Sequence, residues 1–360
     1  MLMVGAGVAR CGVVPVVCVR RNLDSIFLLG QFSIHLGLKE PVFHVVGSLF
    51  IFFRRQTDRD AFMEKTILAL IKERGPLTGA EIRAEISGDH LALWQACLQC
   101  PDLIVRTVGT QYLRLDRRLP GFARLSPSIW RSFLTYSIIG LRERPDPLAE
   151  KADQILDHIE AISRSKLDVA FQTVSGLAAD LDGMEEEACF IIAGDIVYNM
   201  SHDVPRPERS TGKPVNGSDM DMVVVVSDRC SKSSMRRLDE AIYREKFRLL
   251  LNPYSREELD YVVKPFSRVK TQIRCDSFRH ILACKILHEG TFMFGNARLF
   301  QKIKTLLKES GVIKKMQEME HLAKIGRIKA EALLMKVTPD EITDEILNLF
   351  YPSDESEEFE

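Results

Sequence analysis

The chain has 360 residues, which is longer than one ordinary domain and suits two or three packed units. Its hydrophobic content of 46% and charged content of 28% are typical of a soluble globular protein and exclude a disordered or fibrous one. The formal net charge of -1 excludes a globally basic nucleic-acid-binding protein, so any nucleic-acid contact must come from a local patch. Eight scattered cysteines, without the spacing of a small disulfide framework, predict reduced thiols and a cytoplasmic location.

The first sixty residues lack clear signals for helices or strands. Residues 1–19 are apolar, but Arg10 interrupts them and no small-residue cleavage site of a signal peptide follows. The apolar run 42–53 is only about half of the ~20 residues that a membrane-spanning helix needs. Three interpretations stay open: a genuine extension, a start codon assigned upstream of Met63, and, as the least favoured, a membrane anchor.

Residues 61–120 are predicted to form a winged-helix-like domain. Apolar residues recur at helical spacing until Gly75, where a Gly-Pro pair breaks the helix. Thr78 and Glu81 have the spacing of a capping box at the start of a second helix. A third helix is expected over residues 90–100.

Two strand-like segments, residues 103–108 and 111–115, follow the third helix. Gly109-Thr110 lies between them, which predicts a hairpin, the wing of the domain. The third helix contains neither lysine nor arginine, although affinity for DNA comes mainly from neutralising phosphates. We therefore favour a packing or protein-binding module over a DNA reader. The arginines near the wing are Arg106, Arg114, Arg117 and Arg118.

The rest of the chain divides by composition. We predict a helical linker over residues 121–166, a mixed-sheet core over 167–296, a helical region over 297–351 and an acidic tail over 352–360. The linker includes an apolar helix around residues 130–141, and residues 148–181 form one long helix or two successive ones. The fold class expected for the whole chain is α+β.

Two aspartates open a strand in the predicted core. Residues 188–193 form a short buried strand that ends at Gly194, and Asp219 and Asp221 are the first and third residues of the next apolar strand. Side chains two residues apart on a strand project from the same face, so these carboxylates point into one space. Carboxylates suit Mg²⁺ or Mn²⁺, and like charges so close are costly without a cation between them.

A third carboxylate, Asp260, lies on the next predicted strand, residues 258–263. If this strand lies beside the second one, Asp260 reaches the same metals and is the candidate general base. Three carboxylates around two metals suit the in-line attack of a hydroxyl on an α-phosphate.

These residues resemble the polymerase-beta nucleotidyltransferase superfamily. The resemblance rests on the strand ending at Gly194, on Gly217-Ser218-Asp219-Met220-Asp221 leading into an apolar strand, and on Asp260. The segment from Cys284 to Gly295 is also similar to the helix and glycine that close small prokaryotic members. The resemblance covers roughly residues 167–306 and implies Mg²⁺ (or Mn²⁺) bound by Asp219, Asp221 and Asp260, with a nucleoside triphosphate as substrate.

The chain departs from the family at its first motif. The family has Gly followed by Gly or Ser, whereas this chain has Gly194-Asp195, and the loop to Ser218 is about twice the usual length. An aspartate cannot donate a hydroxyl hydrogen bond to a phosphate, so Ser218, or Thr211 and Lys213, would substitute. The predicted nucleotide-binding residues are Gly194, Asp195, Gly217, Ser218, Arg206, Arg209 and Lys213.

The sequence thus predicts an enzyme that moves a nucleoside monophosphate from an NTP to a hydroxyl of a protein, an RNA or a small molecule. The alternative is a catalytically silent regulator of the same fold whose winged helix binds DNA or a protein partner. No membrane partner is expected.

Overall fold

The structure, a computed structural model, describes residues 61–180, 183–208, 211–338 and 341–352. All of these residues belong to one compact unit, and they combine helices with mixed and antiparallel sheets, which confirms the predicted α+β class. The interpretations of residues 1–60 and of the acidic tail from Ser353 onward lie outside the described residues. No helix of the described ranges is long and apolar enough to cross a bilayer.

A three-stranded antiparallel sheet with helices packed on it forms the amino-terminal module. A helix over residues 61–74 comes first, and Thr78 and Glu81 form the expected capping box. The sheet has the order β1–β5–β2. The elements of the module are β1 (Leu77–Thr78), α2 (Gly79–Glu85), α3 (His90–Gln99), β2 (Leu103–Thr107), β3 (Tyr112–Leu115), β4 (Ala123–Ser126), α4 (Ile129–Tyr136) and β5 (Ser137–Leu141).

The predicted hairpin around Gly109-Thr110 is wrong. β2 pairs with β5, and β3 pairs with β4, so the two predicted wing strands do not pair with each other. The predicted helix over residues 130–141 ends at Tyr136, because the β-branched residues Ile138 and Ile139 favour the central strand of a buried sheet. Residues 108–136, hereafter the insert, therefore interrupt the sheet, and the segment predicted as a linker completes the module.

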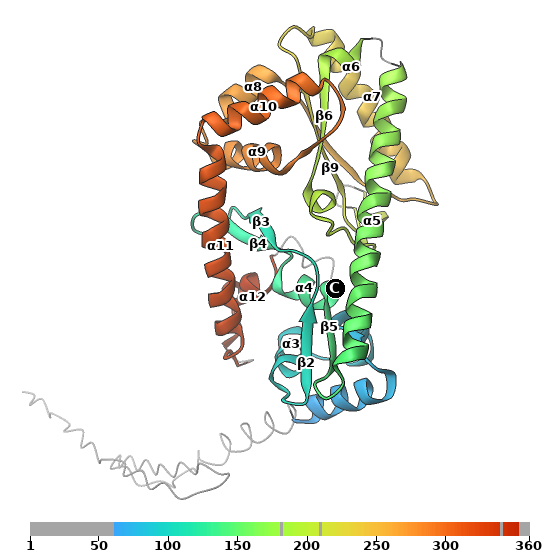
Figure 1. Cartoon of the computed structure of the whole chain (residues 1–360), viewed down its shortest axis with the longest axis vertical. Coiled ribbons are helices and arrows are strands. Elements are labelled where there is room, and N and C mark those ends of the chain that lie inside the picture. The colour runs from blue at the N-terminus through green and yellow to red at the C-terminus, as the bar shows by residue number, and fades with distance from the viewer. Residues whose placement is uncertain (1–60, 181–182, 209–210, 339–340, 353–360) are drawn as a thin grey trace, which may run out of the picture. The chain divides into compact units, whose positions relative to one another are not determined.

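A single helix, α5 (Pro145–Asp180), connects the module to the second sheet (Figure 1). Near its start, Leu148 and Ala152 pack in a cluster with Ile138 of β5. Farther along, Ala170 and Val174 pack in a cluster with the strands of the second sheet. The same helix is thus part of two cores.

The second sheet is mixed and has the order β10–β9–β6–β11, in which only β9 and β10 are parallel neighbours. One face packs on α5 and α7 and the other on α8, α9, α10 and the first half of α11. Side chains alternate between the two faces along β9. Met222 and Val224 pack on the side of α5 and α7, whereas Val223 and Val225 pack on the side of α8, α9, α10 and α11. The bounds are α6 (Met184–Glu187), β6 (Ala188–Ala193), the 3-10 helix η1 (Gly194–Tyr198), β7 (Pro205–Pro207), β8 (Pro214–Asn216), β9 (Met220–Val226), α7 (Lys232–Leu251), β10 (Leu259–Pro265), α8 (Phe266–Gln272), α9 (Phe278–Glu289) and β11 (Thr291–Gly295).

The carboxyl-terminal helices return to the amino-terminal module. They are α10 (Ala297–Glu309), α11 (Val312–Leu334) and α12 (Asp344–Phe350). Leu334 and Phe350 are fully buried in the core of the module, where the Phe350 ring lies 5.3 Å from that of Trp130 and 5.6 Å from that of Trp94. The first half of α11 packs instead under the second sheet.

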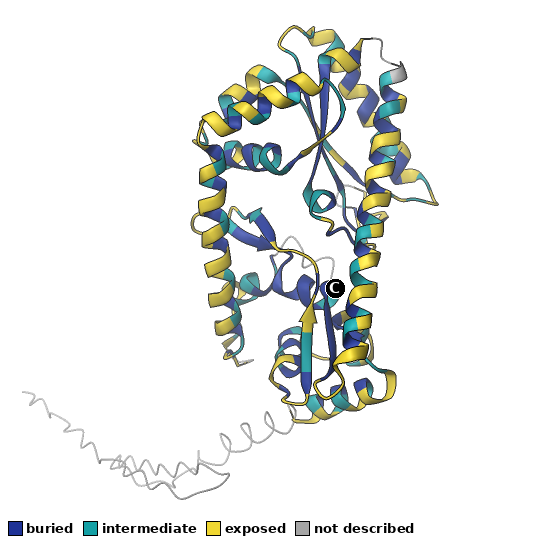
Figure 2. Ribbon diagram, viewed as in Figure 1, coloured by how far each residue is buried: buried dark blue, intermediate teal, exposed yellow. Residues whose placement is uncertain are grey.

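These returning segments cover much of α3. Five of its ten residues are buried, among them Leu91, Leu93 and Trp94 (Figure 2). The side-chain amide of Gln95 donates to the carbonyl oxygens of Leu334 and Val337 at 2.6 and 3.0 Å. The helix that a winged-helix protein would insert into DNA is therefore engaged with its own chain.

Candidate active site

Three aspartates line one cleft at the edge of the second sheet where β9 and β10 begin. Asp221 of β9 is the register partner of Asp260 of β10, and the two strands are parallel, so both side chains project from the same face. Asp219 comes just before β9, which begins at Met220 rather than at Asp219 as predicted. The face is that of Val223 and Val225, on which α9 packs.

The carboxylates raise one another's proton affinity. Burial raises the pKa of Asp221 well above its usual value, and the charges of Asp219, Asp195 and Asp260 add to the increase. Burial also raises the pKa of Asp219, against the opposing influence of Arg206. Such mutual repulsion is the condition under which a bound cation stabilises a group of carboxylates.

Gly194 makes room for Asp221. Its backbone lies in the left-handed region, with φ of +70°, and a Cβ added there would overlap Oδ2 of Asp221 and lie 3.1 Å from its Cγ. A side chain at position 194 would therefore strain the backbone and displace the carboxylate. The glycine of the predicted motif is required by the packing of Asp221.

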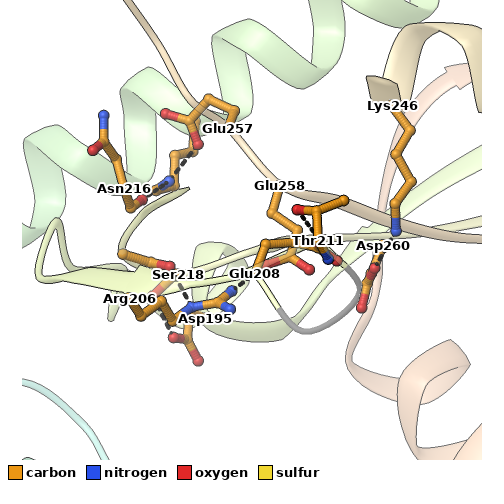
Figure 3. Close-up of polar contacts among 12 residues, drawn as sticks. Asp195, Arg206, Glu208, Thr211, Asn216, Ser218, Lys246, Glu257, Glu258 and Asp260 are labelled. Atoms are coloured by element: carbon orange, nitrogen blue, oxygen red, sulfur yellow. Dashed lines mark hydrogen bonds and ion pairs between the residues drawn. The ribbon is translucent and has the colours of Figure 1, made fainter. Parts of the chain in front are cut away.

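Asp195 connects the second sheet to the insert. The hydroxyl of Tyr112 on β3 donates to its Oδ1. The hydroxyl of Ser218 donates to its Oδ2 at 2.6 Å (Figure 3). The Ser218 oxygen also accepts from the backbone N–H of His202 at 3.2 Å. Both residues line the cleft, and their side-chain oxygens make contacts within the site.

The long loop between β6 and β9 contains a hairpin, β7–β8, that carries Arg206. Nη2 of Arg206 lies 2.7 Å from Oε2 of Glu258, and its Nε donates to the carbonyl of Gly217 at 2.8 Å. A Cβ on Gly217 would overlap the carbonyl of His202, so that position also requires glycine. Lys213 is exposed and, among the described residues, does not line the cleft, while Arg209 lies outside the described residues.

Ion pairs anchor the start of β10. Nζ of Lys246 on α7 lies 2.8 Å from Oδ1 of Asp260, and Nζ of Lys166 on α5 lies 2.5 Å from Oε2 of Glu257 (Figure 3). With the Arg206–Glu258 pair, basic residues from different elements hold acidic residues at or just before the beginning of the strand. By contrast, no salt bridge with a described lysine or arginine holds Asp219 or Asp221.

A cleft of about 450 Å³ opens in front of the aspartates. The sheet wall of the cleft consists of Asp219, Asp221, Asp260 and Glu258, together with Gly194 and Asp195. The insert wall consists of Tyr112, Arg114, Ser126, Pro127, Arg131 and Tyr136, and α9 contributes Leu282, Lys285, Ile286 and Glu289. His202, Arg206 and Ser218 complete the lining. The cleft thus places carboxylates opposite cations.

Three of these cations were not predicted as site residues: Arg114, Arg131 and Lys285. Arg131 is buried in α4, and its position within the apolar sequence Ile-Trp-Arg-Ser-Phe was a usable signal, because a buried arginine needs polar surroundings. Nζ of Lys285 lies 2.6 Å from Oε2 of Glu289 and 5.6 Å from the centre of the Tyr112 ring. The charge of Lys285 also opposes the rise in the pKa of Asp221, which burial causes first of all.

The oxygen ligands present fit a hard divalent cation in type. Within the described ranges, no three or more histidine, cysteine, aspartate or glutamate side chains are gathered closely enough to hold an ion as they stand. Asp260 is turned to Lys246, and Asp195 accepts from two hydroxyls, so Asp219 and Asp221 are the pair most ready to bind. A cation would complete its shell there with water or substrate oxygens.

Comparison of the chain with protein-family models, with curated proteins and with solved structures finds no match. The residues and geometry of the cleft are therefore the observations that bear on function.

Proposed function

We propose that this protein is a metal-dependent nucleotidyltransferase that moves a nucleoside monophosphate from an NTP to a hydroxyl group. The observation that carries the proposal is the parallel register of Asp221 and Asp260, with Asp219 lining the same open cleft. The resemblance of these residues to the polymerase-beta superfamily supports it.

Asp219 and Asp221, with Asp260, would hold Mg²⁺ or Mn²⁺, which when bound supplies electrostatic stabilisation of the triphosphate and lowers the pKa of a hydroxyl. Asp260 lies at the mouth of the cleft, with about half of its side chain exposed, and is the candidate to accept the proton of the attacking hydroxyl. Lys246, 2.8 Å from its Oδ1, orients this carboxylate.

The insert wall is suited to the phosphates. Arg114 and Arg131 line the cleft opposite the aspartates, and Lys285 lies on α9 beside them. Guanidinium groups bind phosphate oxygens with paired, charge-assisted hydrogen bonds. We assign these three residues to the triphosphate because they line the cleft, as Arg206 also does, whereas Lys213 does not line it.

Incubation with α-labelled NTPs and Mg²⁺ tests the proposal. Wild-type protein is expected to release pyrophosphate, and Asp219→Ala or Asp221→Ala to lower the rate by at least about a thousandfold, since a bound metal contributes several kcal/mol. Asp168→Ala, which changes an exposed aspartate on α5, is the matched control and should leave the rate unchanged. Equal rates in all four proteins would rule the proposal out.

Three contacts favour a second candidate, a catalytically silent regulator. Lys246 already neutralises Asp260, and Asp195 replaces the small motif residue of active relatives while accepting from Tyr112 and Ser218. This candidate predicts NTP binding without pyrophosphate release. Because α3 is covered by its own chain, such a regulator would contact a partner through another surface.

A further inference from the structure

Positive charge is concentrated in one stretch of the chain. Residues 266–315 contain eleven lysines and arginines and three aspartates and glutamates, a net charge of +8. Since the whole chain carries -1, the other 310 residues carry -9. The chain thus has one positively charged segment within a negatively charged remainder. This segment contains α8, α9, α10 and the start of α11.

Most of these cations are exposed. Hydrophobic residues of α8, α9, α10 and the first half of α11 pack inward on the second sheet. The ribbon of these helices carries both buried and exposed residues (Figure 2). We call the exposed set the basic surface; its members are Arg268, Lys270, Arg274, Arg279, Arg298, Lys302, Lys308 and Lys314. Asp276 and Glu309 are the exposed carboxylates of the same stretch, and Asp276 pairs with His280 at 2.6 Å.

A shallow groove of about 430 Å³ runs between α8 and α10 within this surface. Lys270 and Lys302 line it together with Phe266 and Glu309. Nζ of Lys270 lies 4.6 Å from the centre of the Phe266 ring and 3.0 Å from a carboxylate oxygen of Asp228. A cationic groove that contains an aromatic ring is typical of sites that bind a phosphate backbone and stack a base.

The basic surface reaches the cleft along α9. Arg279 is exposed, and Leu282 and Ile286, three and seven residues later, line the cleft. Residues at this spacing lie along one side of a helix, so Arg279 is one turn from the cleft lining. A chain of phosphates bound on the surface would thus lead to the aspartates.

We propose that the basic surface binds the backbone of a nucleic-acid strand and directs its terminal hydroxyl into the cleft. The acceptor role rests on the proposed function, whereas the binding role does not. In the transfer, the hydroxyl oxygen forms a bond to the α-phosphorus of the NTP, the bond between that phosphorus and the bridging oxygen breaks, and pyrophosphate leaves. The hydroxyl proton passes to Asp260.

Binding of a fluorescent single-stranded oligonucleotide, measured over a range of salt concentrations, tests the surface. RNA and DNA of the same sequence are compared, and polyglutamate serves as a competitor that is a polyanion but not a nucleic acid. The test variant is Arg274→Glu/Arg279→Glu/Lys302→Glu. The matched control is Lys232→Glu/Arg237→Glu/Arg244→Glu, which reverses three exposed cations on α7, on the opposite face of the sheet.

The test variant should bind at least ten times more weakly, and its slope of log affinity against log salt should fall by about 2, because about 0.7 counterion is released per phosphate contact. The control should match wild type. No binding by wild type, equal binding by both triple variants, or full competition by polyglutamate would overturn the proposal.

The double variant Asp219→Ala/Asp221→Ala separates this proposal from the proposed function. It should bind the oligonucleotide like wild type but should not extend it with labelled NTP. If wild type binds but extends neither RNA nor DNA, the acceptor role fails while the binding surface stands. Extension of only one of the two identifies the acceptor.

Discussion

The two walls of the cleft differ in how their residues are brought together. In the sheet wall, Asp219 and Asp221 are neighbours in sequence, and Asp260 follows on the next strand of the core. In the insert wall, Arg114 and Arg131 come from a segment that interrupts another sheet, and Lys285 faces them from α9. The residues of the sheet wall are brought together by adjacent strands of one sheet. The residues of the insert wall are brought together by the packing of segments that are distant in sequence.

The largest expected effect lies on the sheet wall. Asp221→Asn should lower turnover by about a thousandfold, because it removes a metal-binding charge. It should also raise the melting temperature without metal, since burial and the charges of Asp219, Asp195 and Asp260 disfavour the ionised carboxylate. Differential scanning fluorimetry checks both states: Mg²⁺ should stabilise wild type and not the variant. Equal stabilisation of wild type and variant by Mg²⁺ would show that Asp221 does not bind the metal.

Changes to the insert wall should affect the nucleotide more than the metal. Arg114→Gln and Arg131→Gln are each expected to weaken the binding of a non-hydrolysable NTP analogue about 10- to 100-fold, the scale of a lost charge-assisted hydrogen bond. The stabilisation by Mg²⁺ should persist. Titration calorimetry measures the affinity for the analogue, and thermal unfolding measures the stabilisation by Mg²⁺. The control is Arg106→Gln, on β2 outside the cleft lining. Unchanged affinity in both cleft variants would remove the phosphate role of this wall.

Tyr112→Phe removes a contact between the two walls. The variant leaves Oδ1 of the partly buried Asp195 without the Tyr112 hydroxyl, and the loss of such a donor costs about 1–2 kcal/mol. Urea unfolding should show this loss, together with a smaller loss of activity. Tyr254→Phe alters a ring that is 94% exposed and should change neither. Equal stability of the two variants would show that the walls are held together by other contacts.

The smallest effect concerns the same face of β10 beyond the aspartates. Burial lowers the pKa of Lys264 from 10.5 to about 8, so above pH 8 the folded protein binds fewer protons at this site than the unfolded chain. Stability should therefore rise with pH through this window, by about 1 kcal/mol between pH 7 and pH 9. Lys264→Met should lessen the rise measured by urea unfolding, whereas Lys302→Met, at an exposed position, should not. Identical pH profiles for wild type and Lys264→Met would show that Lys264 does not cause the rise in stability.

Sequence reasoning succeeded where the relevant pattern was local. The spacing of Asp219 and Asp221 predicted that both carboxylates reach one space, and both line the cleft. The strand β10 lies beside β9, which is the condition on which the predicted role of Asp260 depended. The capping box of Thr78 and Glu81 was equally local. The α+β class followed from such segments.

Sequence reasoning failed where pairing depended on distant parts of the chain. The turn-like Gly109-Thr110 suggested a hairpin, but β2 pairs with a strand that begins 30 residues after β2 ends, because the buried β5 fits between β1 and β2. The pairing of Lys246 with Asp260 and the position of Arg131 in the cleft depend on how α7 and α4 pack. The apolar neighbours of Arg131 in the sequence indicate a buried arginine, but no short-range pattern shows which elements α4 and α7 pack against.

The burial of Phe350 against Trp94 and Trp130 has a consequence for synthesis of the protein. The core of the amino-terminal module also includes Leu334, so the part translated early is completed by residues translated about 240 positions later. Contacts so distant in sequence form slowly, and they cannot form on the ribosome before the last helix emerges. During translation the tryptophans of this module therefore stay open to chaperones until α12 is released.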